Sequence, residues 1–179
     1  MTDDERLPDP SSIIPELPVG SAVIVRSRSS EARMQKAQGL WSLCRHHRVS
    51  LLVSSEKPPT QLIGDGVHVP ESGRRNWCRK EFMRQQPGLV TTSAHDLTSA
   101  QRAVAWGTDA VLLSPILPTQ SHPGGRSLGW WRGAAISNQL TVPVIALGGI
   151  DYTTVVRARN LGFFGWAGIS MFVAPARQF

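Results

Sequence analysis

The sequence alternates short apolar runs with segments of helical periodicity, and this alternation limits the fold more than any other feature. Runs rich in Val, Ile and Leu are expected to form strands at Ala22–Arg26, Ser50–Ser54, Gly66–Val69, Leu89–Ser93, Ala110–Ser114, Pro143–Leu147 and Gly165–Ser170. Strands that are apolar along their whole length are typical of sheets covered on both faces. The order strand, helix, strand therefore predicts a parallel sheet.

Helices are expected between most of these strands. The predicted ranges are Glu31–His47, Arg74–Gln86, Leu97–Trp106, Leu128–Gln139 and Thr153–Asn160. Asp96 is placed to cap the third of these helices, and Gly107 or Gly162 can end a helix in the left-handed conformation. The segment between Ser54 and Gly66 is too short and too rich in proline for a full helix, so this crossover is expected to be abbreviated.

The alternation predicts an α/β fold of the (β/α)8 TIM-barrel class, as a single domain over residues 1–179. Such barrels have about 200 residues or more, so this one is expected to be shortened. The polar first ten residues indicate that the first strand is lacking, and the last ten leave little room for most of the last helix. An open doubly wound sheet is the competing architecture, but no G-x-G-x-x-G follows a first strand.

Composition restricts the classes of partner. The net charge is +6, and the basic residues Arg74, Arg75, Arg79, Lys80 and Arg84 lie in one segment, so an acidic ligand or nucleic acid must be considered. Dispersed aromatic residues provide no stacking platform for nucleic acid. No apolar run approaches the roughly 20 residues of a membrane span. Two distant cysteines, Cys44 and Cys78, without metal spacing favour a reduced, cytoplasmic protein.

Glycines follow the last two predicted strands, where ligands of parallel α/β barrels bind. Gly148 and Gly149 end one strand, and Gly168, Ile169 and Ser170 end the next. Glycine lets backbone N–H groups approach an anion without a Cβ in the way. Phosphate groups favour the loops after the last two strands of such barrels. A phosphate-binding cradle is therefore predicted here.

Other polar residues follow earlier strands at the same end. They are Arg26 and Arg28, Ser93 and His95, and Thr119, Ser121 and His122. Guanidinium groups suit phosphate, and a histidine can transfer a proton near neutral pH. His68 lies inside its predicted strand and is interpreted as structural. A zinc site formed by His68, His95 and His122 is the alternative, but no metal site is expected because close ligand spacing is absent.

Several motifs in order resemble the family of thiamine-phosphate synthases and thiazole tautomerases, which are phosphate-binding (β/α)8 barrels. The matching stretches are AVIVRSR, DGVHVPE, TTSAHDLTSA, TDAVLLSPILPTQSHP, PVIALGGID and GISMF. They cover nearly the whole chain. Relative to this family the chain starts late, just after the first strand.

The resemblance implies roles for individual residues. Ser93 and His95 match an S-x-H motif whose histidine is the acid/base in the tautomerases. Thr119 and Ser121 match the loop beside the thiazole, and His122 stands where the synthases have a lysine that steadies the leaving pyrophosphate. The cradle for the thiazole phosphate corresponds to Gly148, Gly149, Gly168, Ile169 and Ser170.

The sequence departs from the synthase pattern where the pyrophosphate and magnesium bind. The motif Q-x-R-x-K reads Ile24, Arg26 and Arg28 here, so both cations remain. The two stretches that carry the magnesium carboxylates read Ser54–Ser55 and Pro70–Gly73. No cofactor is therefore expected, and magnesium is expected only if the protein works as a synthase.

Three hypotheses follow. The first is a protein that binds a thiazole-phosphate-like ligand and transfers a proton through His95, with His122 as a second catalytic candidate. The second is a thiamine-phosphate synthase with a remodelled pyrophosphate site, and the third is a non-catalytic phosphate-ligand binding protein. The expected partner is a small phosphorylated heterocycle, without nucleic acid or membrane.

The open strand edge is expected to be paired by the N-terminal segment or covered in a homo-oligomer.

Overall fold

The computed structural model describes residues 1–76, 78, 81–82, 86–120 and 124–173. The chain divides into two compact units. The first is Met1–Leu89 with Phe172–Phe179, and the second is Val90–Met171.

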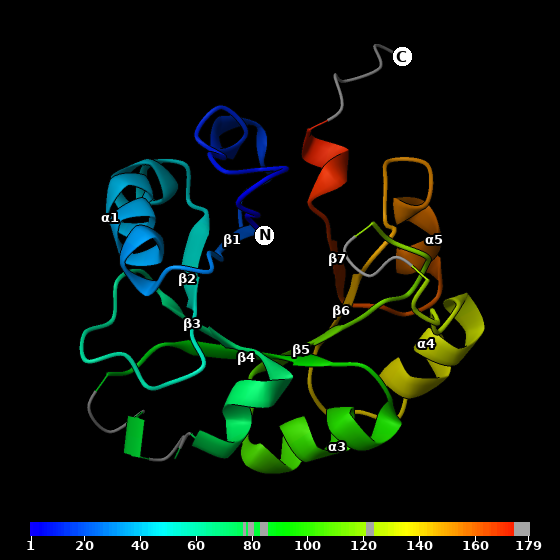
Figure 1. Ribbon diagram of the computed structural model, residues 1–179. Coiled ribbons are helices and arrows are strands. Elements are labelled where there is room, and N and C mark those ends of the chain that lie inside the picture. Colours follow the sequence, from blue (N-terminus) through cyan, green and yellow to red (C-terminus); the bar gives the residue numbers. More distant parts are fainter. Residues whose placement is uncertain (77, 79–80, 83–85, 121–123, 174–179) are drawn as a thin grey trace. The chain divides into compact units, whose positions relative to one another are not determined.

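The first unit contains three parallel strands. They are β1 (Ala22–Val25), β2 (Ser50–Ser54) and β3 (Gly66–Val69), paired in that order. The helix α1 (Ser30–His46) connects β1 to β2 and covers one face of them in Figure 1. Short 3-10 turns lie at η1 (Ile14–Glu16) and η2 (Glu71–Asn76).

The sequence of α1 explains where this helix begins and what it covers. The Ser29 side chain accepts a hydrogen bond from the Ala32 N–H at 3.2 Å and caps the N-terminus. Ala37, Leu40 and Cys44 recur at intervals of three and four residues and are buried against the strands. The helix therefore holds one face of the sheet out of water.

The second unit contains four parallel strands, the first of which starts at the last residue of the first unit. They are β4 (Leu89–Ala94), β5 (Ala110–Leu113), β6 (Val144–Leu147) and β7 (Gly165–Ala167). Figure 1 shows the helices α3 (Leu97–Trp106), α4 (Trp130–Ser137) and α5 (Val155–Asn160) on one side of these strands. A 3-10 turn, η3 (Ser170–Phe172), follows β7.

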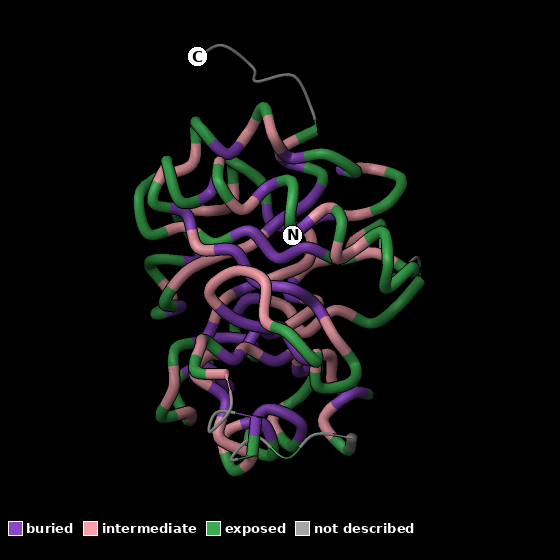
Figure 2. The backbone as a smooth tube through the Cα atoms, turned by 90° about the vertical axis from the view of Figure 1, so that its left-hand side faces the viewer, coloured by how far each residue is buried: buried purple, intermediate pink, exposed green. Residues whose placement is uncertain are grey.

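The strands of the second unit have two different faces. The row Ala94, Leu113 and Ala146 is fully buried and belongs to the core that the helices cover. The next row in register carries Ser93, Leu112, Ile145 and Gly165 on the opposite face, because successive side chains of a strand alternate. Figure 2 shows which stretches of the backbone are buried, intermediate and exposed.

Aspartates fix the start of two strands by the same pair of bonds. The Asp65 carboxylate accepts from the Leu51 N–H at 2.8 Å, and the Asp65 N–H donates to the Leu51 carbonyl at 2.7 Å. Asp109 forms the same pair with Val90, at 2.7 and 2.8 Å. Each aspartate therefore ties the residue before one strand to the preceding strand.

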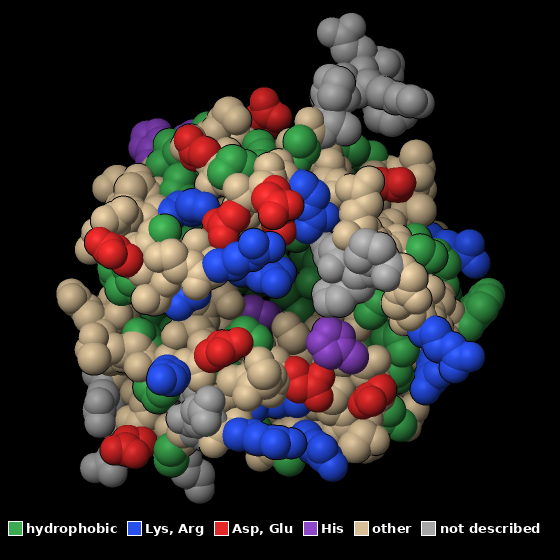
Figure 3. All heavy atoms as spheres, viewed as in Figure 1, with side chains coloured by type: hydrophobic (Ala, Val, Ile, Leu, Met, Phe, Trp, Pro, Cys, Tyr) green, Lys and Arg blue, Asp and Glu red, His purple; other side chains and the backbone are tan. Residues whose placement is uncertain are grey.

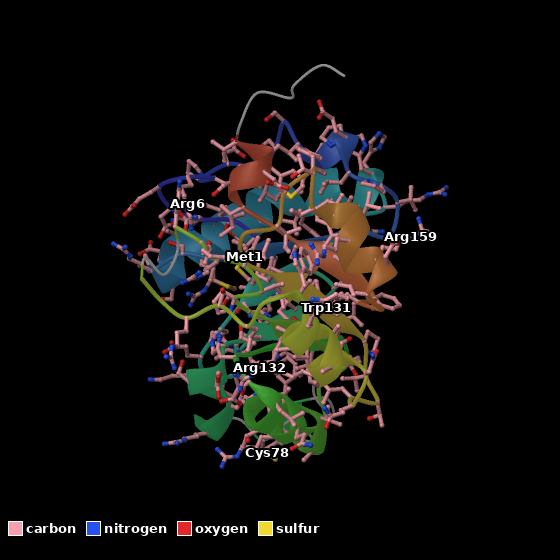
Figure 4. All side chains as sticks on the ribbon, turned by 90° about the vertical axis from the view of Figure 1, so that its right-hand side faces the viewer. Met1, Arg6, Cys78, Trp131, Arg132 and Arg159 are labelled. Atoms are coloured by element: carbon pink, nitrogen blue, oxygen red, sulfur yellow. The ribbon has the colours of Figure 1, made fainter. Side chains whose placement is uncertain are left out.

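The first turn of the helix α4 places one tryptophan in the core and the next in solvent. Trp130 is buried and packs edge-on against Phe163 at a centroid distance of 6.4 Å, with the Arg157 guanidinium 5.8 Å from its ring. The neighbouring Trp131, labelled in Figure 4, is 72% exposed and points outward.

The prediction of seven parallel-sheet strands is confirmed, and so is the helix Leu97–Trp106 with its Asp96 cap. Gly107 ends this helix with φ +100°, and Gly162 has φ +83° after α5. The expected abbreviated crossover between β2 and β3 is confirmed as well, because no helix lies between these described strands.

Several predicted boundaries are wrong. The helix expected from Leu128 begins at Trp130, because the Leu128 N–H donates to the Pro115 carbonyl and Gly129 has φ +74°. The helix expected from Thr153 begins at Val155. The last strand ends at Ala167 rather than Ser170. The helix expected from Arg74 does not start there, because residues 71–76 form a 3-10 turn, but residues 81–82 within the expected range are helical. Residues 77, 79–80 and 83–85 lie outside the described part.

The N-terminal segment pairs with the edge of β1, as expected. The Thr2 N–H donates to the Ile24 carbonyl at 2.9 Å, and the Thr2 hydroxyl donates to the Arg26 carbonyl and accepts from the Arg26 N–H. Thr2 is fully buried. Figure 1 shows the N end beside β1. Across the described residues, no helix is long and apolar enough to cross a membrane.

Candidate functional site

His95 follows β4 directly, and its ring contacts the end of β5. The His95 Nδ1 lies 2.7 Å from the Ser114 backbone carbonyl and 3.4 Å from the Ser114 hydroxyl. The side chain of His95 is exposed. The contact between His95 and Ser114 therefore holds an accessible imidazole at the carboxyl ends of two adjacent parallel strands.

The start of α3 supports the main chain of His95. The Asp96 carboxylate accepts from the Ser99 N–H at 2.7 Å, and the Ser99 hydroxyl accepts from the N–H groups of His95 and Asp96. The Ser99 bonds lower the pKa of Asp96 below its usual value, with the charges of His95 and Arg102 adding to this effect. Asp96 therefore remains a charged helix cap.

Gly148 and Gly149 end β6 under the loop that follows β5. Gly148 has φ +93° and Gly149 has φ +68°, which favours glycine at both positions. An added Cβ on Gly149 would lie 2.6 Å from both the Leu117 Cβ and the Pro118 carbonyl oxygen. The Leu117 N–H donates to the Gly148 carbonyl at 3.0 Å. The glycine pair is thus required by close backbone packing, whatever ligand it binds.

The end of β7 lies beside the end of β6. Leu147 and Ala167 are register partners, and an added Cβ on Gly168 would lie 3.6 Å from the Ile150 carbonyl oxygen. Ile169 is buried, whereas Ser170 is exposed at the start of η3. The structure therefore brings the two predicted glycine-containing strand ends together in one unit.

Ser93 and Thr119 are half-buried in the same unit. Ser93 is the register partner of Leu112, and Leu112 is the partner of Ile145. This row places one hydroxyl and two aliphatic side chains on the face that the helices do not cover. Ser121 and His122, also predicted for the site, lie outside the described residues.

Arg26 and Arg28 belong to the first unit, so the contacts above do not include them. Both are exposed. Arg28 lies 3.6 Å from Glu5, and Lys36 lies 3.5 Å from Asp4; the side chains of Arg28 and Glu5 are 91% and 78% exposed. Figure 3 shows such oppositely charged side chains in contact on the face it presents. The Arg28 pair is screened by water and contributes little to stability.

His68 is buried in β3 with 2% exposure, which agrees with its structural interpretation. Burial lowers its pKa from 6.5 to about 3, and the nearby positive charges of Arg26 and the chain's amino terminus lower it further. The folded protein therefore holds this imidazole neutral near pH 7.

His68 gives a prediction for the pH dependence of stability. Between pH 6.5 and about 3 the unfolded chain binds a proton that the folded chain excludes, so stability falls as the pH falls through this window. At pH 5 the expected loss is about 2 kcal/mol. Chemical denaturation at pH 7 and pH 5 measures it. His68→Asn should remove the His68 share of this slope and leave the share of the buried Met1 amino group, whose pKa is lowered to about 6. His46→Asn, at an exposed position, should retain the whole slope, and equal slopes in the two variants would contradict the assignment.

Of the two stretches that match the magnesium positions of the resembled family, the first has no carboxylate and the second has one, whereas magnesium is bound through carboxylates and other oxygen ligands. Ser54 and Ser55 stand at the first, and the Ser55 hydroxyl donates to the Lys57 carbonyl at 2.6 Å. At the second, Glu71 lies 3.4 Å from Arg74. Within the described part of the chain, no three His, Cys, Asp or Glu residues could hold a metal ion together.

Sequence reasoning missed three residues that form hydrogen bonds with candidate positions or with their neighbours. Glu56 accepts from the Ser72 hydroxyl at 3.3 Å, which places a second carboxylate beside residues 71–73. The Ser114 carbonyl has no sequence signature, because every residue carries one. Ser99 stands at the third position after the Asp96 cap, where the capping-box pattern could have revealed it.

Comparisons with known proteins find relatives over most of the chain. A family model described as thiamine monophosphate synthase matches residues 17–172. The chain is 26% identical over 172 residues to the thiamine-phosphate synthase of Bacillus cereus, covering 90% of this chain and 78% of that protein. It is 28% identical over 162 residues to that of Chloroflexus aurantiacus, covering 87% and 74%.

A solved structure shares the fold. The thiamine phosphate pyrophosphorylase from Pyrococcus furiosus superposes with a TM-score of 0.77 at 21% sequence identity. The superposition covers 97% of this chain and 85% of that chain. This likeness shows a common parallel α/β fold.

Proposed function

Because the chain belongs to the thiamine monophosphate synthase family, we propose that it binds a thiazole-phosphate-like ligand and transfers a proton on it through His95. The observation that carries this proposal is the contact between His95 Nδ1 and the Ser114 carbonyl. It holds an imidazole at the strand ends of the unit that also contains both glycine-rich ends.

The second unit provides the three functions that such a reaction needs. The backbone N–H groups of Gly148 and Gly149, with those of residues 168–170, bind the phosphate. The row of Ser93, Leu112 and Ile145 provides an apolar surface with one hydroxyl for the ring. His95 removes a proton from one ring position and returns it to another, so the composition of the ligand is unchanged. The family's sequence pattern adds Thr119, Ser121 and His122 as further residues for binding and catalysis.

A second candidate function is thiamine-phosphate synthesis, which the names of the relatives favour. In that case Arg26, Arg28 and His122 bind the pyrophosphate leaving group of the pyrimidine substrate. A synthase would have to stabilise this leaving group without the two carboxylates of the family's magnesium site. The first candidate needs only an anchored phosphate and a positioned imidazole. A non-catalytic binding protein is the third candidate.

We propose the following for the class of barrel and for the domain organisation. The chain forms a barrel of the (β/α)8 class as one domain over residues 1–179. The seven parallel strands support this, and the Thr2 bonds to Ile24 and Arg26 give the edge of β1 a partner. A second copy of the chain could cover the rest of that edge.

One set of assays separates the three candidates. With thiazole carboxylate phosphate in D2O, NMR should show interconversion of the ring tautomers and deuterium incorporation, both unchanged by EDTA. Pyrimidine pyrophosphate with thiazole phosphate and magnesium should give no thiamine phosphate. Formation of thiamine phosphate would instead establish the synthase, and calorimetric binding without either reaction would establish the non-catalytic protein.

A further inference from the structure

We propose that His95 acts from one fixed tautomer, with its proton on Nδ1 and its reactive lone pair on Nε2, and that Ser99 is the positioning residue that maintains it. This inference rests on the proposed function for its catalytic consequence. The tautomer itself is a property of the ligand-free protein and can be measured without turnover.

The Ser114 carbonyl determines which nitrogen carries the proton. A carbonyl oxygen can only accept a hydrogen bond, and it lies 2.7 Å from His95 Nδ1. In the other neutral tautomer, two lone pairs would face each other at this distance. The Ser114 hydroxyl could donate to Nδ1, but it is farther away, at 3.4 Å. The carbonyl therefore holds the proton on Nδ1 and leaves Nε2 as the acceptor.

The Ser99 hydroxyl holds the main chain from which this ring projects. Ser99 is 4% exposed. Its hydroxyl accepts from the His95 N–H at 2.9 Å and the Asp96 N–H at 3.1 Å, and it donates to the Asp96 carbonyl at 3.1 Å. One donor and two lone pairs are all that a hydroxyl offers, so its capacity is fully used.

The two anchors act on different parts of the same residue. Ser99, on α3, fixes the backbone of His95, and Ser114, after β5, fixes the near side of its ring. Nε2, on the far side, takes a proton from the ligand to give an imidazolium with N–H groups on both nitrogens. The same Nε2 returns the proton to the ligand, while the Nδ1 proton remains bonded to Ser114 throughout.

The capping box provides a matched pair of variants. Ser99→Ala removes the hydroxyl that bonds the His95 N–H. Asp96→Ala removes the carboxylate that caps α3 through the Ser99 N–H but leaves the Ser99 hydroxyl in place. Both variants weaken the start of α3, and only the first releases His95. Ser99→Thr retains a hydroxyl and serves as the rescue variant.

The first readout is the ring nitrogen spectrum of ¹⁵N-histidine-labelled, ligand-free protein, with the His95 signals assigned by their loss in His95→Gln. The wild type, Asp96→Ala and Ser99→Thr should show the Nδ1–H tautomer. Ser99→Ala should show signals averaged between the two tautomers. An Nε2–H or averaged ring in the wild type, or a Ser99→Ala spectrum identical to that of the wild type, would overturn the inference.

The second readout is the kinetics with thiazole carboxylate phosphate. Ser99→Ala should lower kcat about tenfold with KM within about twofold, because the imidazole is misplaced while the phosphate contacts remain. Asp96→Ala should stay within about threefold of the wild-type kcat. A fixed tautomer in a wild type that lacks turnover would refute the proposed function alone, and wild-type kcat in Ser99→Ala would refute the positioning role alone.

Discussion

Replacing His95 by alanine lowers kcat for thiazole carboxylate phosphate about a thousandfold and leaves KM within about threefold, because general acid–base groups contribute factors of this size. The variant removes both ring nitrogens, and with them the bond to the Ser114 carbonyl. Binding through the phosphate is retained, because the ends of β6 and β7 are untouched. Deuterium incorporation from D2O, followed by NMR, measures the loss.

A matched variant separates loss of chemistry from loss of a surface histidine. His46 is also exposed, but it lies on α1 in the first unit. His46→Ala should retain wild-type kcat. Full turnover in His95→Ala with proper folding would exclude His95 as the proton-transfer group and leave the ligand site without its central residue.

Gly149→Ala should raise KM at least about tenfold and destabilise the protein by roughly 2–4 kcal/mol, the range of a strained and overpacked backbone position. Gly149 has φ +68°, and the new methyl group would lie 2.6 Å from both the Leu117 Cβ and the Pro118 carbonyl oxygen. The Pro115–Pro118 loop must then move away from the end of β6. This movement displaces the backbone N–H groups proposed for the phosphate.

Gly129 provides the control for backbone strain alone. It has φ +74°, similar to Gly149, but an added Cβ there has no atom within 4 Å. Gly129→Ala should therefore cost about 1–3 kcal/mol without changing KM, because Gly129, with φ +74° and ψ +161°, has a backbone conformation that is essentially restricted to glycine. Denaturation curves and calorimetric titration with thiazole phosphate give both quantities. Equal effects in the two variants would argue against the close approach and against the phosphate site together.

The strands were predictable because each is a short run of mainly apolar or β-branched residues, a signal that needs no knowledge of distant residues. The helix Leu97–Trp106 was predicted to the residue because local signals mark both ends, an aspartate before it and a left-handed glycine after it. The start of α4 was missed because it depends on a bond from the Leu128 N–H to Pro115, thirteen positions earlier in the sequence. Local pattern cannot reveal such a bond.

Some features of the candidate site could likewise be predicted from the sequence, and others could not. Glycines at Gly148 and Gly149 could be predicted from residue type and position. Their packing under Leu117 and Pro118 could not, because it depends on how two loops meet. His95 was recognisable as a polar residue after a strand, whereas its bond to a backbone carbonyl required coordinates.

The aspartates before β3 and β5 explain how the two crossovers can differ so much. Asp65 and Leu51 are 14 residues apart, and Asp109 and Val90 are 19 residues apart, yet the same two bonds join each pair. These bonds join the two ends of each crossover segment, so the residues between the ends can vary in length and structure. One crossover includes the helix α3 and the other has no helix among its described residues. Evolution could therefore lengthen, shorten or replace either segment without disturbing the strands that it joins.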